Sequence, residues 1–302
     1  MPSPPGMVFS GFQEPSAEKR YLMTGLTQRM KNASLTQKEQ AVMERITGEI
    51  NKTAFLSGIQ LAEECGVSAT FITRLVHKLG YEKFADFKEE LGERYRKATS
   101  PYDMFQNFAV MGGMTEVVKS SIVQDLANLS SMEKLLDPRV LEQVVDSIDQ
   151  CRKVYMVAMF ASEVAVQMMG HYLWRLGKPY ESLTGVGLSK KVEFSDVGKG
   201  DVLLAFSSQR VLKEVRDAVL FAKKQGAVTI AITDNAANPL ACASDHVLLA
   251  PVQGVAVDYT HVATLAMLDL IVNSLAQKNP EIVAQSLEKE SSRCDSRDLF
   301  CL

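Results

Sequence analysis

Residues 203–215 read LLAFSSQRVLKEV, an apolar run that passes through two serines directly into a charged, helix-like segment. Four more short β-rich runs occur in the same half of the chain: KVYMVAM (153–159), PYESLT (179–184), AVTIAIT (227–233) and HVLLAP (246–251). Helical stretches separate them. Runs that are apolar nearly throughout and alternate with helices predict a parallel sheet covered on both faces. We therefore expect a C-terminal α/β three-layer sandwich with a five-stranded parallel sheet.

The first half of the chain has a different, helical pattern, and its most informative stretch is SGIQLAEECGVSATFITRLVHKLG (57–80). It predicts two helices joined by a tight turn. Ala62 falls where two helices cross closely, and Gly66 supplies the turn, where a residue with positive φ is wanted. Ser68 is a natural N-cap for the second helix. The positions expected to point inward are Leu61, Cys65, Val67, Ile72 and Leu75.

The residues of the second helix divide between a buried face and a polar face. Its buried stripe is expected to hold Phe71, Ile72, Leu75, Val76 and Leu79. The polar side offers hydroxyls and basic groups with few carboxylates, which suits base edges and phosphates in a DNA major groove. The candidate DNA-binding residues are Ser68, Thr70, Thr73, Arg74, His77 and Lys78. The alternative is that this face is the solvated surface of an ordinary helical domain.

The flanking segments extend the pattern. LTQKEQAVMERI (35–46) predicts a helix with a capping box formed by Thr36 and Glu39, and LGYEKFADFKEEL (79–91) follows the second helix. On these motifs Leu35–Leu91 resembles the N-terminal domain of the RpiR family of bacterial transcription regulators. The resemblance implies an all-α helix-turn-helix domain that binds double-stranded DNA.

Members of that family carry a C-terminal sugar isomerase (SIS) domain that usually binds a phosphorylated sugar as effector. Residues 153–276 resemble it in element order, through GHYLWRLGKP, GDVLLAFSS and AITDNAANPLACASDHVLLAP. Ligands of such sheets bind beyond the carboxyl ends of the strands, and the Ser207 loop leads into a helix N-terminus that favours an anion. The implied effector-binding residues are Ser162, Ser207, Ser208, Gln209 and Arg210.

Both loops of the expected pocket depart from the family pattern. Ala158 and Phe160 stand where the family has glycines, and Arg210 replaces the glycine of the central loop. Three interpretations stay open. Arg210 could grip an anion in an altered site; the pocket could take a larger or uncharged effector with Phe160 as an apolar wall; or a degenerate SIS domain could serve only to oligomerise.

Catalysis is the main rival to regulation, because related SIS domains include sugar-phosphate isomerases. Glu214 and His261 are the candidate bases. Both residue types at such helix positions are more often structural, and the attached DNA-reading domain argues against an enzyme. We find no catalytic, cofactor or metal-ligand spacing. The five scattered cysteines and the lack of a long apolar run favour a cytoplasmic protein with reduced thiols and no membrane partner.

Together these features predict five regions: a disordered leader (1–18), the helix-turn-helix domain (19–100), a helical linker (101–150), the SIS-like domain (151–280) and a C-terminal tail (281–302). We expect a homodimer or homotetramer that reads a palindromic operator, since two helix-turn-helix units on one two-fold axis match such a site.

Overall fold

Two units make up the chain, Met1–Arg94 and Tyr95–Leu302, and each is described by itself. The computed structural model describes residues 17–98, 102, 105, 108, 113–193 and 195–295. The leader predicted at residues 1–18 falls outside this part except for its last two residues.

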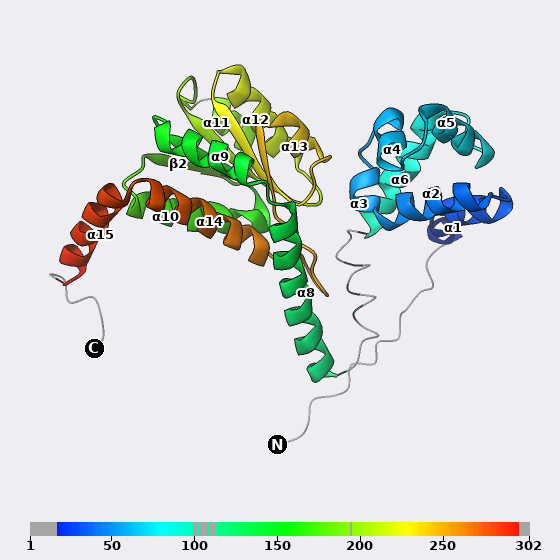
Figure 1. Cartoon of the computed structure of the whole chain (residues 1–302), viewed down its shortest axis with the longest axis horizontal. Coiled ribbons are helices and arrows are strands. Elements are labelled where there is room, and N and C mark those ends of the chain that lie inside the picture. The colour runs from blue at the N-terminus through cyan, green and yellow to red at the C-terminus, as the bar shows by residue number, and fades with distance from the viewer. Residues whose placement is uncertain are drawn as a thin grey trace. The chain divides into compact units, whose positions relative to one another are not determined.

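Helices build the N-terminal unit (Figure 1). They are α1 (Ala17–Asn32), α2 (Gln37–Gly48), α3 (Ile50–Thr53), α4 (Gly58–Glu64), α5 (Ala69–Lys78) and α6 (Phe84–Ala98), whose last residues pass into the second unit. Most of these helices contribute large apolar side chains that are almost fully buried: Leu26, Met43, Ile46, Leu61, Ile72, Leu75, Phe87 and Leu91. The predicted capping box is present, because the Thr36 side chain accepts from Glu39 N–H while Glu39 accepts from Thr36 N–H. Helix α2 therefore begins where the sequence predicts.

From residue 113 on, the second unit first forms two helices, α8 (Met114–Leu135) and α9 (Pro138–Gln150). Strands and helices then alternate. The strands are β1 (Val154–Ala158), β2 (Tyr180–Thr184), β3 (Val202–Phe206), β4 (Val228–Thr233) and β5 (His246–Leu249). The helices are the 3-10 turn η1 (Phe160–Ser162), α10 (Glu163–Arg175), α11 (Leu188–Glu193), α12 (Lys213–Lys224), α13 (Pro239–Ala243), α14 (Val262–Lys278) and α15 (Pro280–Asp295).

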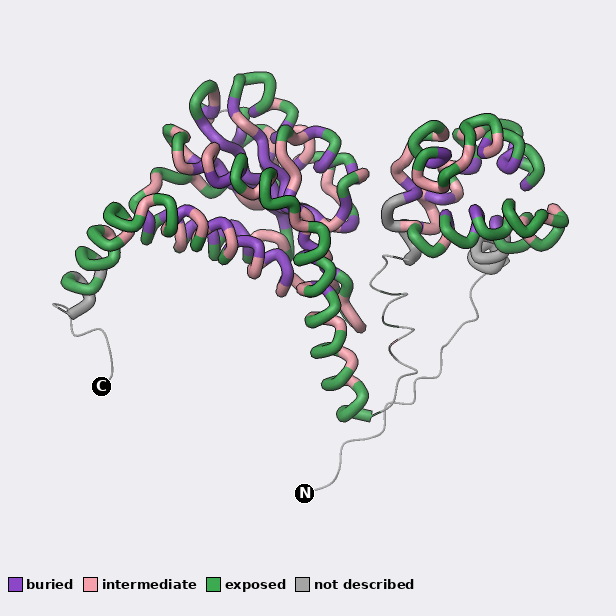
Figure 2. The backbone as a smooth tube through the Cα atoms, in the orientation of Figure 1, coloured by how far each residue is buried: buried purple, intermediate pink, exposed green. Residues whose placement is uncertain are grey.

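The five strands form one parallel sheet in the order β2-β1-β3-β4-β5. The central strands β1 and β3 pair in register from Val154 opposite Val202, and every residue of both is buried (Figure 2). Burial on both faces explains why these strands read as continuous apolar runs rather than alternating ones. The five-stranded parallel sheet predicted from the sequence is confirmed.

Helices cover both faces of this sheet (Figure 1). On one face Met156, Leu204 and Ile230 pack into a core shared with α9, α10 and α14. On the other, alternate residues of the same strands, such as Tyr155 and Leu203, pack against α11, α12 and α13. The three-layer α/β/α arrangement follows, because successive strand residues point to opposite sides.

The end of the described chain is helical. Helix α15 (Pro280–Asp295) begins at the last residue of the predicted SIS-like domain and runs through most of the segment predicted as a tail, and the Ser286 hydroxyl donates to the Arg175 carbonyl at 2.5 Å. Residues 296–302 lie outside the described part. None of the helices within the described ranges is long and apolar enough to cross a membrane.

Candidate functional site

Helix α5 and the turn before it form as the sequence predicts. Gly66 has φ +64°, the left-handed conformation that glycine adopts without strain, and the Ser68 hydroxyl caps α5 by accepting from Phe71 N–H at 3.2 Å. Ala62 is 2% exposed where α4 meets α5. The two helices thus pack closely, with a short turn between them.

The predicted faces of α5 are largely confirmed. Ile72, Leu75, Val76 and Leu79 are buried. Phe71 is only half-buried, as are Cys65 and Val67, because these side chains lie at the rim of a small unit rather than at its centre. The six candidate DNA-binding residues are all exposed: Ser68, Thr70, Thr73, Arg74, His77 and Lys78. Five of them lie along the exposed side of α5, and Ser68 lies at its N-cap; we call these six residues the α5 polar face.

Several groups on the α5 polar face already have partners. Lys78 Nζ lies 2.6 Å from Glu39 Oε2, His77 Nδ1 lies 3.1 Å from the Tyr81 carbonyl oxygen, and the Thr73 hydroxyl donates to Ala69 O. Thr70 and Arg74 make no side-chain hydrogen bond or ion pair with any other residue in the described ranges. They are the groups most available to an external ligand.

Two basic residues near α5 were not predicted. Lys38, in the first turn of α2, lies over the Phe71 ring at 5.5 Å from the ring centroid. Arg29 of α1 donates to the Gly80 carbonyl at 3.0 Å and stacks on the Tyr81 ring at 4.5 Å, which fixes the turn after α5. Both contacts join helices that are far apart in the sequence, so no local pattern could reveal them.

A second candidate site lies at the carboxyl edge of the sheet, where the loops after β1, β3 and β4 meet because the strands are parallel. The loops after β3 and β4 are tied by buried polar groups. The Thr233 hydroxyl donates to the Ser207 carbonyl at 2.6 Å, and Asn238 Nδ2 donates to that hydroxyl at 2.6 Å. Ser207 is consequently buried and held in place, with Ser208 half-buried beside it.

Gln209 follows these serines. It takes a left-handed conformation, with φ +57°, and its N–H donates to Asp234 Oδ1 at 2.8 Å. Its side chain is 4% exposed, and Oε1 has no hydrogen-bond partner within the described part of the chain. Burial raises the pKa of the Asp234 carboxyl. Arg210 is exposed at the surface.

The loop after β1 also carries a strained residue. Phe160 has φ +56° and is 71% exposed, so its ring turns outward instead of filling the space above the sheet. Its N–H donates to Glu163 Oε1 at 3.2 Å. Ser162 is half-buried at the start of α10 and makes no side-chain capping bond there.

The two residues considered as isomerase bases have different surroundings. Glu214 Oε2 accepts from Leu188 N–H at 2.8 Å and so caps the start of α11. His261 precedes α14; its Nδ1 is buried with no hydrogen-bond partner among the described residues, and burial lowers its pKa. Glu214 is therefore engaged in holding the fold, and His261 favours its neutral form.

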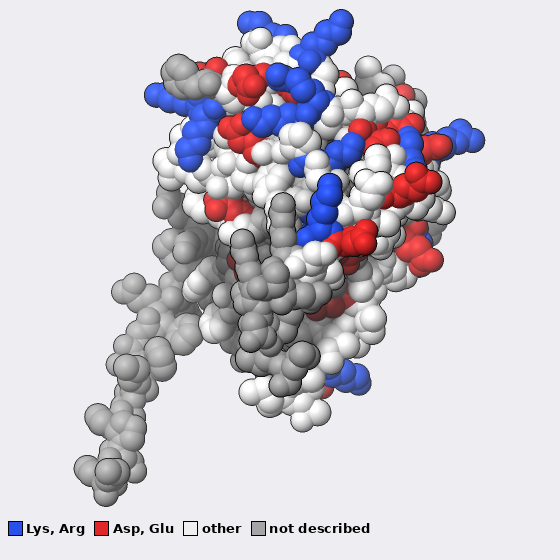
Figure 3. Space-filling model, turned by 90° about the vertical axis from the view of Figure 1, so that its left-hand side faces the viewer, with Lys and Arg blue, Asp and Glu red and all other residues white. Residues whose placement is uncertain are grey.

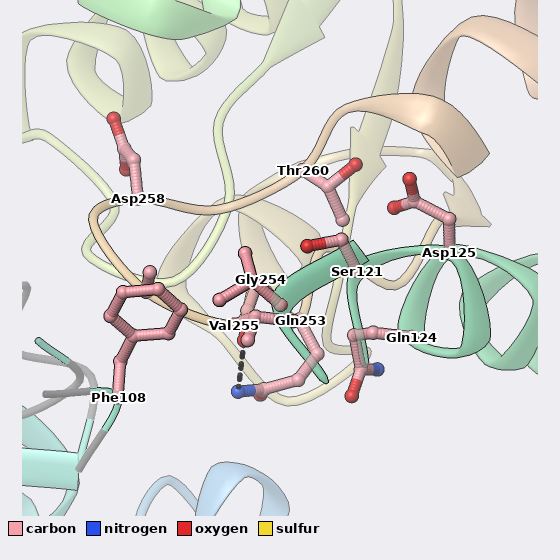
Figure 4. A pocket seen from close by; sticks show the side chains of 11 residues that line it. Phe108, Ser121, Gln124, Asp125, Gln253, Gly254, Val255, Asp258 and Thr260 are labelled. Atoms are coloured by element: carbon pink, nitrogen blue, oxygen red, sulfur yellow. Dashed lines mark hydrogen bonds between the residues drawn. The ribbon is translucent and has the colours of Figure 1, made fainter. Parts of the chain in front are cut away.

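A shallow hollow lies between α8 and the loop that follows β5 (Figure 4). It is lined by Phe108, Val117, Ser121, Gln124, Asp125, Gln253, Gly254, Val255, Ala256, Asp258 and Thr260. The lining holds two aspartates and no basic residue, so this hollow does not suit a phosphate group. On the face shown in Figure 3, Lys and Arg are interspersed with Asp and Glu, which leaves no large field of one sign there.

The comparisons with known proteins match this architecture. Residues 23–98 match the model of the helix-turn-helix domain of the rpiR family, and residues 147–274 match the model of the SIS domain. The chain belongs to the RpiR family of transcription regulators. This RpiR-family protein is a DNA-binding transcription regulator with a SIS domain.

Named relatives support the assignment. An HTH-type transcriptional regulator of Haemophilus influenzae is 24% identical over 263 residues, which cover 85% of this chain and 91% of the relative. The regulator HexR of Pseudomonas aeruginosa is 25% identical over 210 residues, 70% of this chain and 72% of HexR.

Solved structures have the same fold as this regulator. The sugar isomerase domain of an RpiR transcription factor from Sphaerobacter thermophilus covers 57% of this chain and 97% of its own, with a TM-score of 0.54 and 27% identity. The Vibrio vulnificus NanR protein, solved in complex with ManNAc-6P, covers 93% of this chain and 100% of its own, with a TM-score of 0.60 and 22% identity.

Proposed function

We propose that this regulator binds operator DNA through the α5 polar face and that a phosphorylated sugar or a related metabolite, bound at the carboxyl edge of the sheet, modulates that binding. The observation that carries the DNA part is the common exposure of six hydroxyl-bearing and basic residues, one at the N-cap of α5 and five along the side of the helix opposite its buried residues. Arg74 is the central residue of this proposal, because its guanidinium has no partner among the described residues and suits either a guanine edge or a phosphate.

The effector part rests on the loop after β3. Helix α12 begins at Lys213, and its N-cap residue Leu212 offers no side-chain cap, so the first N–H groups of this 12-residue helix are left for another acceptor. Such a helix start favours an anion, and Ser207, Ser208 and Arg210 precede it. That the Vibrio vulnificus NanR protein was solved with ManNAc-6P supports a sugar phosphate as the class of effector. Ser162, from the loop after β1, and Gln209, from the loop after β3, are the remaining residues of the proposed effector site.

A second candidate is a degenerate SIS domain that serves only to oligomerise. The observation that favours it is the burial of Gln209 within the loop where a ligand would need accessible donors. Isomerase activity has less support than either of these two functions. Glu214 already accepts a hydrogen bond from the Leu188 N–H, and the relatives named above are regulators.

The DNA-reading geometry calls for more than one copy. Two α5 polar faces related by a two-fold axis would match a palindromic operator, so we propose a homodimer or homotetramer.

A thermal-shift screen tests the effector. The purified protein is heated with sugar phosphates, amino-sugar phosphates and their unphosphorylated parents. A ligand at about 100 times its Kd should add roughly 2.7 kcal/mol to stability. Arg210→Ala should abolish the shift, while Lys224→Ala, which removes the same charge from the other end of α12, should keep it. A shift with a neutral sugar alone would contradict the phosphate site, and no shift with any compound would favour the degenerate domain.

A further inference from the structure

His77, on the α5 polar face, has one ring nitrogen that is already bonded. Its Nδ1 lies 3.1 Å from the Tyr81 carbonyl oxygen. A carbonyl oxygen can only accept a hydrogen bond, so Nδ1 must carry the imidazole hydrogen and donate it. In a neutral imidazole the other ring nitrogen, Nε2, then has no hydrogen and is an acceptor. The contact with Tyr81 therefore selects the tautomer of His77.

The residue that supplies this carbonyl is held by three helices. Tyr81 is 6% exposed, its hydroxyl donates to Glu90 Oε2 of α6 at 2.5 Å, and Arg29 of α1 stacks on its ring. Its N–H donates to the Val76 carbonyl of α5 at 3.2 Å. Because the acceptor is fixed, the imidazole ring is held in one orientation as well as one tautomer.

The other edge of the His77 ring is open. His77 is exposed, and its Nε2 makes no hydrogen bond with any other residue in the described ranges. His77 follows Thr70 by seven residues and Thr73 by four, so the three side chains lie along one line of α5. The α5 polar face thus presents a free acceptor in line with two hydroxyls.

We propose that His77 Nε2 accepts a hydrogen bond from the amino group of a base in the DNA major groove, either N4 of cytosine or N6 of adenine. These amines are the only hydrogen-bond donors that the bases display in that groove. Guanine N7 and O6 and thymine O4 are acceptors and would face the Nε2 lone pair. The inference rests on the proposed function, since it names the base group that one residue of the α5 polar face recognises.

A phosphate does not suit His77 in this tautomer. Phosphate oxygens accept hydrogen bonds, as Nε2 does, so two acceptors would meet. The guanidinium of Arg74 has only donors and suits a phosphate or a guanine edge. An acceptor at His77 and donors at Arg74 would allow α5 to distinguish the two kinds of base edge.

Removal of the base amine tests the contact. Duplexes that the parent protein binds are selected from random DNA, and His77→Ala identifies the position whose base preference depends on residue 77. At that position purine then replaces adenine, or 2-pyrimidinone replaces cytosine, which removes only the amine. Fluorescence anisotropy should show the Kd of the parent rising about fivefold and that of His77→Ala unchanged. Both proteins bind the same duplexes, so any distortion by the analogue cancels.

Two further variants separate accepting from donating. The amide oxygen of Gln can take the place of Nε2, so His77→Gln should keep the preference for the amine. Lys has donors only, so His77→Lys should lose it. His171→Ala, the same change as His77→Ala at an exposed histidine of α10, should bind every duplex as the parent does. Circular dichroism of each variant should match the parent protein.

The tautomer is measured without DNA. Nitrogen NMR of the imidazole rings, assigned by the signal that His77→Gln removes, should show a protonated Nδ1 and an unprotonated Nε2. A hydrogen on Nε2 would overturn the inference.

Two binding results would also overturn it. The parent could bind selected duplexes equally well with and without the amine, or His77→Ala could weaken binding equally on selected and unrelated DNA, which would mean a phosphate contact. Failure of the parent to bind any DNA would instead refute the proposed function, and the base contact with it.

Discussion

Lys78 on α5 and Glu39 on α2 form an ion pair, with 2.6 Å between Nζ and Oε2. Glu39 also closes the capping box at the start of α2, where it accepts from the Thr36 N–H at 2.8 Å. One carboxylate thus holds the start of α2 and the end of the helix that carries the α5 polar face. The contact joins positions 39 residues apart, so it fixes how the two helices meet.

We expect Glu39→Gln to strengthen DNA binding two- to fivefold at low salt, because Lys78 loses its competing carboxylate and becomes free for a phosphate. Fluorescence anisotropy with a labelled operator measures the Kd at several salt concentrations. Glu44→Gln, an equal change of charge on the exposed side of α2, separates the release of Lys78 from the change in net charge. Equal effects of the two variants would count against the role of the ion pair.

Acid should weaken the N-terminal unit through the same carboxylate. The hydrogen bond from Lys78, followed by that from the Thr36 backbone, lowers the pKa of Glu39 to about 2. A lowered folded-state pKa stabilises the fold above the unfolded-state value of about 4.3 and ceases to do so as pH falls through the folded-state value. We therefore expect a loss of about 1 kcal/mol between pH 5 and pH 2, limited by solvent screening. Urea unfolding at each pH should show this loss in Glu44→Gln and a smaller one in Glu39→Gln.

Arg74→Ala should weaken operator binding by about 1–3 kcal/mol without changing the melting temperature, since Arg74 is exposed and forms no contact that supports the fold. Anisotropy with operator and with unrelated DNA distinguishes the two possible contacts. A loss confined to the operator indicates a base contact, and an equal loss on both DNAs indicates a phosphate contact. Lys224→Ala serves as the charge control, and unchanged binding by Arg74→Ala would exclude Arg74 from the DNA contact.

Glu214→Ala should destabilise the SIS domain by about 1–2 kcal/mol, because it leaves the Leu188 N–H without its acceptor. Glu214→Gln keeps an acceptor oxygen and should cost less. Thermal unfolding of both variants gives the comparison. If Gln were as damaging as Ala, the negative charge rather than the cap would be what matters at this position.

Phe160→Gly should be about 1 kcal/mol more stable than Phe160→Ala, since only glycine takes φ +56° without strain and the Phe160 ring is mostly exposed. Chemical denaturation measures the difference. A larger loss with Gly than with Ala would show that this loop is not strained in solution.

The sequence predicted the structure best where a feature depends on a local apolar pattern or on one residue type at a fixed offset. The apolar runs predicted β1, β3, β4 and β5, because strands covered on both faces must be apolar nearly throughout. The edge strand β2 is mostly polar and only partly buried, so its pattern is weaker. The Gly66 turn and the Thr36 and Ser68 caps were likewise predicted, since each depends on one residue type at a fixed offset. The order of the strands in the sheet is set by crossovers that no local pattern encodes.

The candidate sites were less predictable. Exposure of the α5 polar face followed from helical periodicity, but the ion pair of Lys78 depends on how α2 and α5 meet. At the sheet edge, the sequence alone placed Gln209 and Arg210 together as ligand contacts. The left-handed turn at Gln209 is bonded to Asp234 from the loop after β4. The Gln209 side chain is buried there, while Arg210 remains at the surface.

The hydrogen bonds among Ser207, Thr233 and Asn238 make the loops after β3 and β4 a single stiff piece. The loop after β1 is built differently, because the Phe160 N–H bonds only to Glu163 a few residues on. The loops after β3 and β4 are thus held to each other, whereas the loop after β1 is held by a bond within itself. If a ligand binds at this edge, we expect the loop after β1 to shift more than the other two, together with α10, which packs against α14 and α15. The pattern of hydrogen bonds would then decide which helices respond to a ligand.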